Sequence, residues 1–216
     1  MRQDRPVRIM DDVVSVSAST MGWGITFAIQ SDGSLWGWGN NSSGALGIGT
    51  TNNIPNSTPI KIMENVAAVS ANHETVMAIT NDGILWGWGW NFAGLIPGQP
   101  ERPRFSEPSP IQIMDGVISV STGALHVMVI RYDGSLWAWG NNEFGQLGDG
   151  TTNDRITPIK VLENVVSVST GGRHTLALKN DGSLWTWGLT KESQLSDDTL
   201  SSSLVPIRIM DGIMLP

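Results

Sequence analysis

The chain has 216 residues, of which 40% are hydrophobic and 15% are charged, so we expect a globular protein with a sizeable core and exclude a disordered chain. Its net charge of −7 argues against nucleic acid or an anionic membrane surface as a main partner, because both attract basic surfaces. The absence of cysteine excludes disulfides, thiolate catalysis and cysteine zinc sites.

Three short phrases recur along the chain. An Asp-Gly pair that leads into two tryptophans begins at Asp32, Asp82, Asp133 and Asp181, at intervals of 48 to 51 residues. A phrase of the type Pro-Ile-x-Ile-Met occurs at 6–13, 59–66, 110–117, 158–165 and 206–213. A third phrase, of the type Val-Val-Ser-Val-Ser, follows each of the first four copies of the second. A period of this length predicts a solenoid or a propeller.

Each repeat reads as four short strands. In the clearest one the expected strands are 158–162, 165–169, 175–179 and 183–188, and apolar and polar residues alternate in the second and third. The Asn-Asp-Gly segment before the last strand favours a tight hairpin turn. No stretch shows a sustained helical period. The predicted fold class is therefore all-β, a β-propeller of four-stranded antiparallel blades with about four blades present, as an incomplete ring or open arc.

The phrases divide a single domain, residues 1–216, into repeat units at about 6–58, 59–109, 110–157 and 158–205, followed by the start of a fifth unit at 206–216. The second phrase occurs five times and the Trp hairpin four times. This mismatch fits a fragment of a longer propeller, or an arc that closes by dimerisation or by strand completion between its two ends. We favour the fragment or open arc. Such an arc leaves sheet faces uncovered, so we expect self-association through open blade faces.

The tryptophans of each hairpin lie two residues apart, as in Trp36 and Trp38, so both point to one face of their strand. They could form a light-absorbing or ligand-stacking array, or they could pack one blade on the next. We favour packing, because a buried indole removes a large apolar area from water.

The segment 140–188 resembles the regulator of chromosome condensation repeat in its bacterial style. The matching elements are Gly-Asn-Asn at 140–142, Gly-Gln-Leu-Gly at 145–148, Pro158, and the phrases "VVSVSTGGRHTLAL" and "DGSLWTWG". The resemblance covers essentially the whole chain. It implies a propeller that is usually closed and seven-bladed. It also implies protein-binding roles, with precedents in an exchange factor for a small GTPase and a bacterial inhibitor that caps a β-lactamase.

We therefore expect a non-enzymatic β-propeller scaffold that mediates protein–protein interaction, as part of a larger bacterial secreted or surface protein. The alternative is a regulatory module, similar to a guanine nucleotide exchange factor or an enzyme inhibitor, that acts on one specific protein partner. A light sensor similar to the plant ultraviolet-B photoreceptor of the family is disfavoured, because Gly172 stands where the sensing Trp would be. An extracellular or cell-surface location is favoured, although this chain contains no signal peptide. Neither nucleic acid nor membrane insertion is expected.

The polar motifs give no catalytic or metal site. His126 and His174 hold the same place in successive repeats, and we expect each side chain to bond blade backbone. The Asp-Gly aspartates are assigned to turn formation. The segment 148–154 has scattered oxygen ligands but lacks the twelve-residue calcium loop pattern. No cofactor is expected.

One segment, residues 89–110, departs most from the repeat. It contains Trp90, Phe92, Arg102, Arg104 and Phe105, which we take as candidate protein contacts because aromatic and Arg residues dominate interface hot spots. The alternative is a degenerate loop that has drifted without function.

Overall fold

The computed structural model describes residues 5–19, 24–98, 105–189 and 202–213 and confirms the predicted fold class. The described chain forms four antiparallel sheets of four strands each, with neighbouring strands in chain order. Its only helical element is the short 3-10 turn η1 (Phe92–Gly94), so none of its helices is long and apolar enough to cross a membrane.

The strands of the first sheet are β1 (Val13–Ala18), β2 (Ile25–Gln30), β3 (Leu35–Asn41) and β4 (Asn52–Met63). The second contains β5 (Val66–Asn72), β6 (Thr75–Thr80), β7 (Leu85–Asn91) and β8 (Phe105–Met114). The third contains β9 (Val117–Thr122), β10 (His126–Arg131), β11 (Leu136–Gly140) and β12 (Arg155–Leu162). The fourth contains β13 (Val165–Thr170), β14 (His174–Lys179), β15 (Leu184–Leu189) and β16 (Ser202–Met210).

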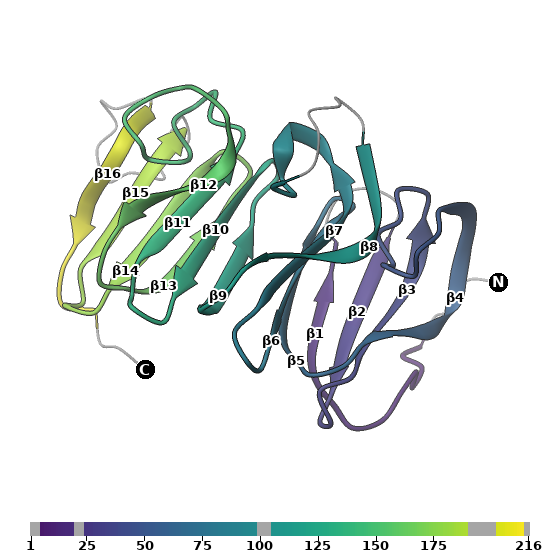
Figure 1. Ribbon diagram of the computed structural model, residues 1–216. Coiled ribbons are helices and arrows are strands. Elements are labelled where there is room, and N and C mark those ends of the chain that lie inside the picture. Colours follow the sequence, from purple (N-terminus) through teal and green to yellow (C-terminus); the bar gives the residue numbers. More distant parts are fainter. Residues whose placement is uncertain (1–4, 20–23, 99–104, 190–201, 214–216) are drawn as a thin grey trace.

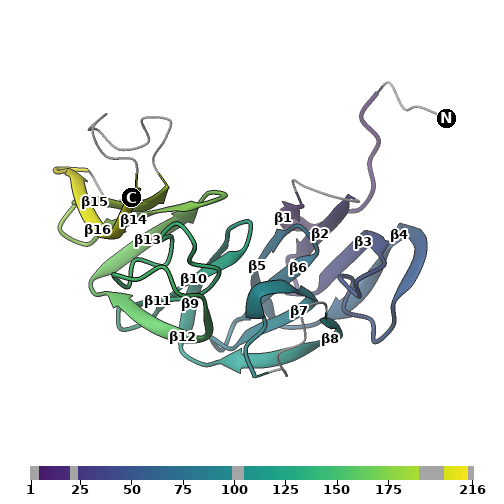
Figure 2. The same ribbon diagram turned by 90° about the horizontal axis from the view of Figure 1, so that it is seen from above.

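The four sheets stand side by side in chain order (Figure 1), and the row bends into an arc with β8 and β12 on its convex side (Figure 2). The first strand of each sheet contacts the first strand of the next. Serine side chains join these inner strands in a regular way. The hydroxyl oxygens of Ser17, Ser70 and Ser121 accept hydrogen bonds from the backbone N–H of Ala71, Thr122 and Thr170, at 3.3, 3.2 and 3.1 Å.

The second sequence phrase lies at the end of each sheet and not at the start of the next unit. Each sheet ends five residues after the expected repeat unit, for example at Met63 and not at 58. Strand β16 pairs with β15, so residues 206–210 complete the fourth sheet instead of opening a fifth unit. The proline of the phrase suits an outer strand, where its missing N–H faces away from the sheet. The first copy, residues 6–12, belongs to no sheet in the described part of the chain.

The Asp-Gly aspartates form turns, as expected. The carboxylates of Asp32, Asp133 and Asp181 each accept a hydrogen bond of 2.8 to 3.0 Å from the backbone N–H two residues on. The side-chain bond from the serine at that same position lowers the pKa of each of the three carboxyls below its ordinary value. These aspartates therefore serve the hairpins.

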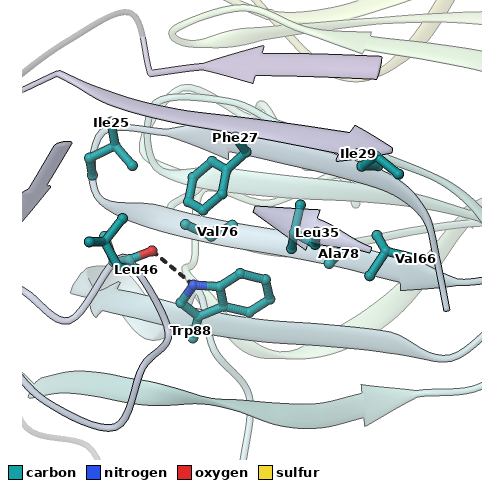
Figure 3. Packing of buried hydrophobic residues seen from close by; sticks show 10 residues of the cluster. Ile25, Phe27, Ile29, Leu35, Leu46, Val66, Val76, Ala78 and Trp88 are labelled. Carbon is teal, nitrogen blue, oxygen red and sulfur yellow. Dashed lines mark hydrogen bonds between the residues drawn. The ribbon is translucent and has the colours of Figure 1, made fainter. Parts of the chain in front are cut away.

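Consecutive sheets meet at three joints, and the second tryptophan of a hairpin lies at the centre of each. Trp88, Trp139 and Trp187 are fully buried, and their indole N–H groups donate to the carbonyls of Ala45, Leu95 and Gln146 at 2.8 to 2.9 Å. Each carbonyl belongs to the loop between the third and fourth strands of the preceding sheet. Figure 3 shows this arrangement at the first joint. Gly148 lies directly on Trp187, since an added Cβ would stand 2.7 Å from the indole nitrogen.

The first tryptophan of each pair has a different role. The N–H groups of Trp36, Trp137 and Trp185 donate to the serine hydroxyl two residues earlier, at 2.8 to 2.9 Å. In the second hairpin Ile84 stands at the position of this serine and has no hydroxyl. The buried N–H of Trp86 accordingly has no hydrogen-bond partner among the described residues. The two rings of a pair thus share a face of the strand. The second ring is fully buried in the joint in Trp88, Trp139 and Trp187, whereas Trp86 and Trp185 pack against the joint while only partly buried.

Candidate functional site

The loops at one end of the second, third and fourth sheets line an open groove of about 840 Å³. This is the end where η1 lies in Figure 1. The second sheet contributes His73, Trp90 and Phe92, the third contributes Leu125, Glu143 and Phe144, and the fourth contributes Arg173 and Leu189. We call this feature the aromatic groove.

One wall of the aromatic groove is a stack of rings. The rings of Trp90 and Phe92 lie 5.0 Å apart between centroids and 20° from parallel. The centroid of the His73 ring lies 6.5 Å from that of the Trp90 ring, and the two ring planes are 38° apart. Phe92 is 37% exposed, so the stack presents a ring to solvent. Rigid aromatic surface of this kind is typical of binding anchors, because few rotamers are lost when a partner docks.

Another part of the groove lining pairs a ring with a cation. The Arg173 guanidinium carbon lies 4.5 Å from the centroid of the Phe144 ring, within the range of a cation–π contact. Glu143 is exposed beside them. The groove therefore combines apolar rings with one positive and one negative side chain, which suits recognition of a polypeptide segment more than a simple apolar ligand.

The loop that carries Trp90 and Phe92 keeps a hydrogen bond that is also found in the corresponding loops of the first and third sheets. The side-chain Oδ1 of Asn91 accepts a hydrogen bond from the backbone N–H of Ile96 at 2.7 Å. Asn41 and Asn142 bond the N–H groups of Leu46 and Leu147 in the same way, at 2.9 and 3.0 Å. The loops that follow the third strands of the first, second and third sheets therefore share this asparagine bond.

Two of the five candidate contacts meet in the groove. Trp90 and Phe92 line it together, whereas Arg102 and Arg104 lie outside the described residues. Phe105 begins β8 and pairs with Asn91 through the backbone, and its side chain also lies outside the description. Sequence reasoning missed His73, Phe144 and Arg173, which are distant in the chain. Their only signal was their position in loops between predicted strands.

The structure corrects the expectation for His126. Its Nε2 lies 3.1 Å from the side-chain hydroxyl of Thr175 in the next sheet, so it bonds a side chain and not blade backbone. The Thr175 hydroxyl donates to the carbonyl of Gln146 at 2.9 Å, which leaves it free to accept from a protonated Nε2. Full burial lowers the pKa of His126 to about 3, with a smaller contribution from the charge of His174.

The acidic loop 148–154 is organised by an ion pair. Both Nε and Nη2 of Arg155 donate to the Asp149 carboxylate, at 2.8 and 2.6 Å. Burial alone would raise the pKa of Asp149, but the bonds from Thr151 and Arg155 lower it overall. The residues that the structure describes contain no group of three or more acidic, His or Cys side chains that could hold a metal ion.

Comparison with known proteins agrees with this architecture. The family model of the RCC1-like domain matches residues 2–213. The regulator of chromosome condensation of Xenopus laevis is 27% identical over 154 residues, which is 68% of this chain and 36% of that protein. This chain therefore spans about a third of the length of that relative.

Two solved structures show the same fold. Human WBSCR16 superposes with a TM-score of 0.81 at 21% identity, over 95% of this chain and 55% of that one. Prp20p of Saccharomyces cerevisiae superposes with a TM-score of 0.75 at 18% identity, over 92% of this chain and 50% of that one. The four sheets thus correspond to about half of each solved chain, and this protein belongs to the family of RCC1-like β-propeller domains.

Proposed function

We propose that this chain is a protein-binding module and that its partner enters the aromatic groove with an extended polypeptide segment. The observation that carries the proposal is the Trp90–Phe92 stack, which lines the same groove as Arg173 and Phe144. We assign binding and no catalytic step to the groove, because rings and Arg side chains are typical of interface anchors.

The relatives support a role of this kind. Prp20p has been characterised for its binding to Gsp1p and histones, and it has also been solved bound to Kap60. The net charge of −7 favours protein partners over nucleic acid for this chain. The proposal includes the context inferred from the bacterial style of the repeats, a larger secreted or cell-surface protein.

The test uses a variant in which two loop residues of the second sheet are replaced by their equivalents from the first sheet. Trp90→Asn with Phe92→Ser places there the residues found at Asn40 and Ser42. Because the buried Asn91 bonds are untouched, we expect the fold to be kept, with a loss of about 0.5–1.5 kcal/mol in the free energy of unfolding from the removed ring pair. A displayed library of random peptides selected on the immobilised chain should give binders that lose about tenfold or more in affinity on this variant.

The matched control is Tyr132→Ser, which removes an exposed ring that does not line the aromatic groove. It should leave the selected peptides bound. Peptides that bind the Trp90→Asn, Phe92→Ser variant as tightly as the original chain would overturn the assignment of the groove. Peptides that lose affinity only on the Tyr132→Ser variant would also overturn this assignment.

A further inference from the structure

Two chain positions recur at every joint, at the end of the sheets where the aromatic groove lies. The first is the residue before the second strand of a sheet, whose carbonyl accepts an N–H from the end of the third strand. It is held by Glu74, Leu125 and Arg173, which accept from Trp90, Asn141 and Leu189 at 2.8, 2.7 and 2.9 Å. The second position is the pair of residues that follows the bonded loop asparagine of the preceding sheet, which is 42–43, 92–93 and 143–144. The side chains at these positions can therefore be compared from joint to joint.

At the first joint the two positions satisfy one another. The Glu74 carboxylate accepts hydrogen bonds from the hydroxyl groups of Ser42, at 3.2 Å, and of Ser43. None of these three residues lines the aromatic groove. The charge at this joint is thus bonded within the chain and is not left for a partner.

At the second joint both positions are apolar. Phe92 stands at the place of Ser42, Leu125 stands at the place of Glu74, and both side chains line the groove. Neither can donate or accept a hydrogen bond. Together with Trp90, which stacks on Phe92, this joint suits an apolar side chain of a partner.

At the third joint the first position carries an unpaired cation. The exposed guanidinium of Arg173 lies over the Phe144 ring and forms an ion pair with no carboxylate of the described chain. By contrast, four other arginines each pair with an aspartate, namely Arg8, Arg131, Arg155 and Arg208. Since a cation–π contact takes up no carboxylate, the N–H groups of Arg173 remain able to bind one through two parallel hydrogen bonds.

The negative charges of the chain limit how acidic the partner can be. Glu143 also lines the groove, and the chain has a net charge of −7. A run of acidic residues would be repelled by this field, whereas one carboxylate in contact with Arg173 gains a charge-assisted bond. The site therefore fits a single acidic side chain among uncharged neighbours.

We propose that the partner segment in the aromatic groove carries one Asp or Glu, whose carboxylate binds Arg173, and an apolar side chain that packs on Phe92 and Leu125. This inference rests on the binding role proposed above for the groove, and it adds the chemistry of the partner. The carboxylate belongs to a side chain and not to a chain end, because the groove is open and receives an extended segment.

The test uses peptides displayed by fusion through their C-termini, so that side chains supply the only carboxylates. Peptides are selected on the original chain, kept if they lose affinity on the Trp90→Asn, Phe92→Ser variant, and synthesised with amidated C-termini. We expect them to contain an Asp or Glu. Its replacement by Asn or Gln should weaken binding to the original chain by about tenfold or more.

Arg173→Leu is the matched variant, because Leu125 holds this position in the third sheet. It should bind the acidic peptides about tenfold or more weakly, and their Asn or Gln forms as the original chain does. Arg208→Leu removes a positive charge outside the aromatic groove and should change the affinity by less than about twofold. Glu143→Ser removes a negative charge from the groove and should strengthen binding by about two- to fivefold. Circular dichroism checks that each variant is folded.

The outcomes separate this inference from the proposed function. Peptides that need Trp90 and Phe92 but contain no acidic residue, or that bind Arg173→Leu as tightly as the original chain, would overturn this inference and leave the proposed function standing. Equal losses on Arg173→Leu and Arg208→Leu would mean only long-range attraction and would also overturn it. If the proposed function itself fails, the selected peptides will bind the Trp90→Asn, Phe92→Ser variant undiminished.

Discussion

The first and third joints share a hydrogen-bonded tryptophan, which we call the frame of the joint. They differ in the side chains packed beside it, which we call the filling. In both, a buried indole N–H donates to a loop carbonyl, from Trp88 to Ala45 and from Trp187 to Gln146, each at 2.9 Å. Beside Trp88 the strand partner is Val76, and the Phe27 ring meets the indole edge-on at 6.3 Å. Beside Trp187 the strand partner is Thr175, whose hydroxyl is bonded to His126 and Gln146.

This difference separates what holds the sheets together from what can vary between them. Because both joints keep the indole and the carbonyl, these groups supply the common packing. The filling is apolar in one joint. In the other it is a hydrogen-bonded polar pair, in which the buried Nδ1 of His126 has no partner among the described residues. Of these two sets of side chains beside the indole, only the one at the third joint contains a titratable group, His126.

The largest effect should come from breaking the shared frame. Trp88→Ala or Trp187→Ala removes a fully buried ring and leaves a cavity, so we expect each to lower the free energy of unfolding by about 3–5 kcal/mol. Urea denaturation followed by circular dichroism would measure the loss. The comparison predicts similar losses at the two joints. A much smaller loss at one of them would show that the frame is not common.

A smaller effect should distinguish the joints by pH. Since folding holds the pKa of His126 at about 3, against an ordinary 6.5, the unfolded chain binds a proton that the folded chain does not between these values. Stability from this residue is complete above about pH 6.5 and falls as the pH drops, by about 2 kcal/mol at pH 5. The variant His126→Ile with Thr175→Val should lack this part of the acid dependence. An unchanged slope in the double variant would contradict the assignment.

The smallest effect concerns conversion of the third joint into the first. Thr175→Val alone leaves the His126 N–H buried without its acceptor, so it should cost about 1–3 kcal/mol at pH 8. Adding His126→Ile removes the unpaired imidazole N–H and gives the third joint the same residue pair as Ile25 and Val76 at the first joint. Most of the lost stability should therefore be recovered. A double-mutant cycle would give the coupling energy. Simple additivity of the two changes would mean that the pair does not act as a unit.

The repeated local features were accessible from the sequence. Alternation in the strands, Asp-Gly turns and the spacing of tryptophans are properties of a few adjacent residues, and they led correctly to four antiparallel sheets. The role of Trp88 was not accessible, because it depends on a carbonyl 43 residues away in the chain. For the same reason the bond of His126 was assigned to the wrong partner.

The sequence by itself determined that this protein is a row of similar β-sheets, since hairpins and strand periodicity are encoded within each repeat. The sequence also identified Trp90 and Phe92 as unusual, because they differ from the residues at the equivalent positions of the other repeats. Only the tertiary structure decided which sheet receives residues 206–210, which rings lie in the joints, and which distant loops form the groove. These outcomes depend on contacts between repeats, and side chains some 50 or more residues apart meet there only after the sheets have stacked.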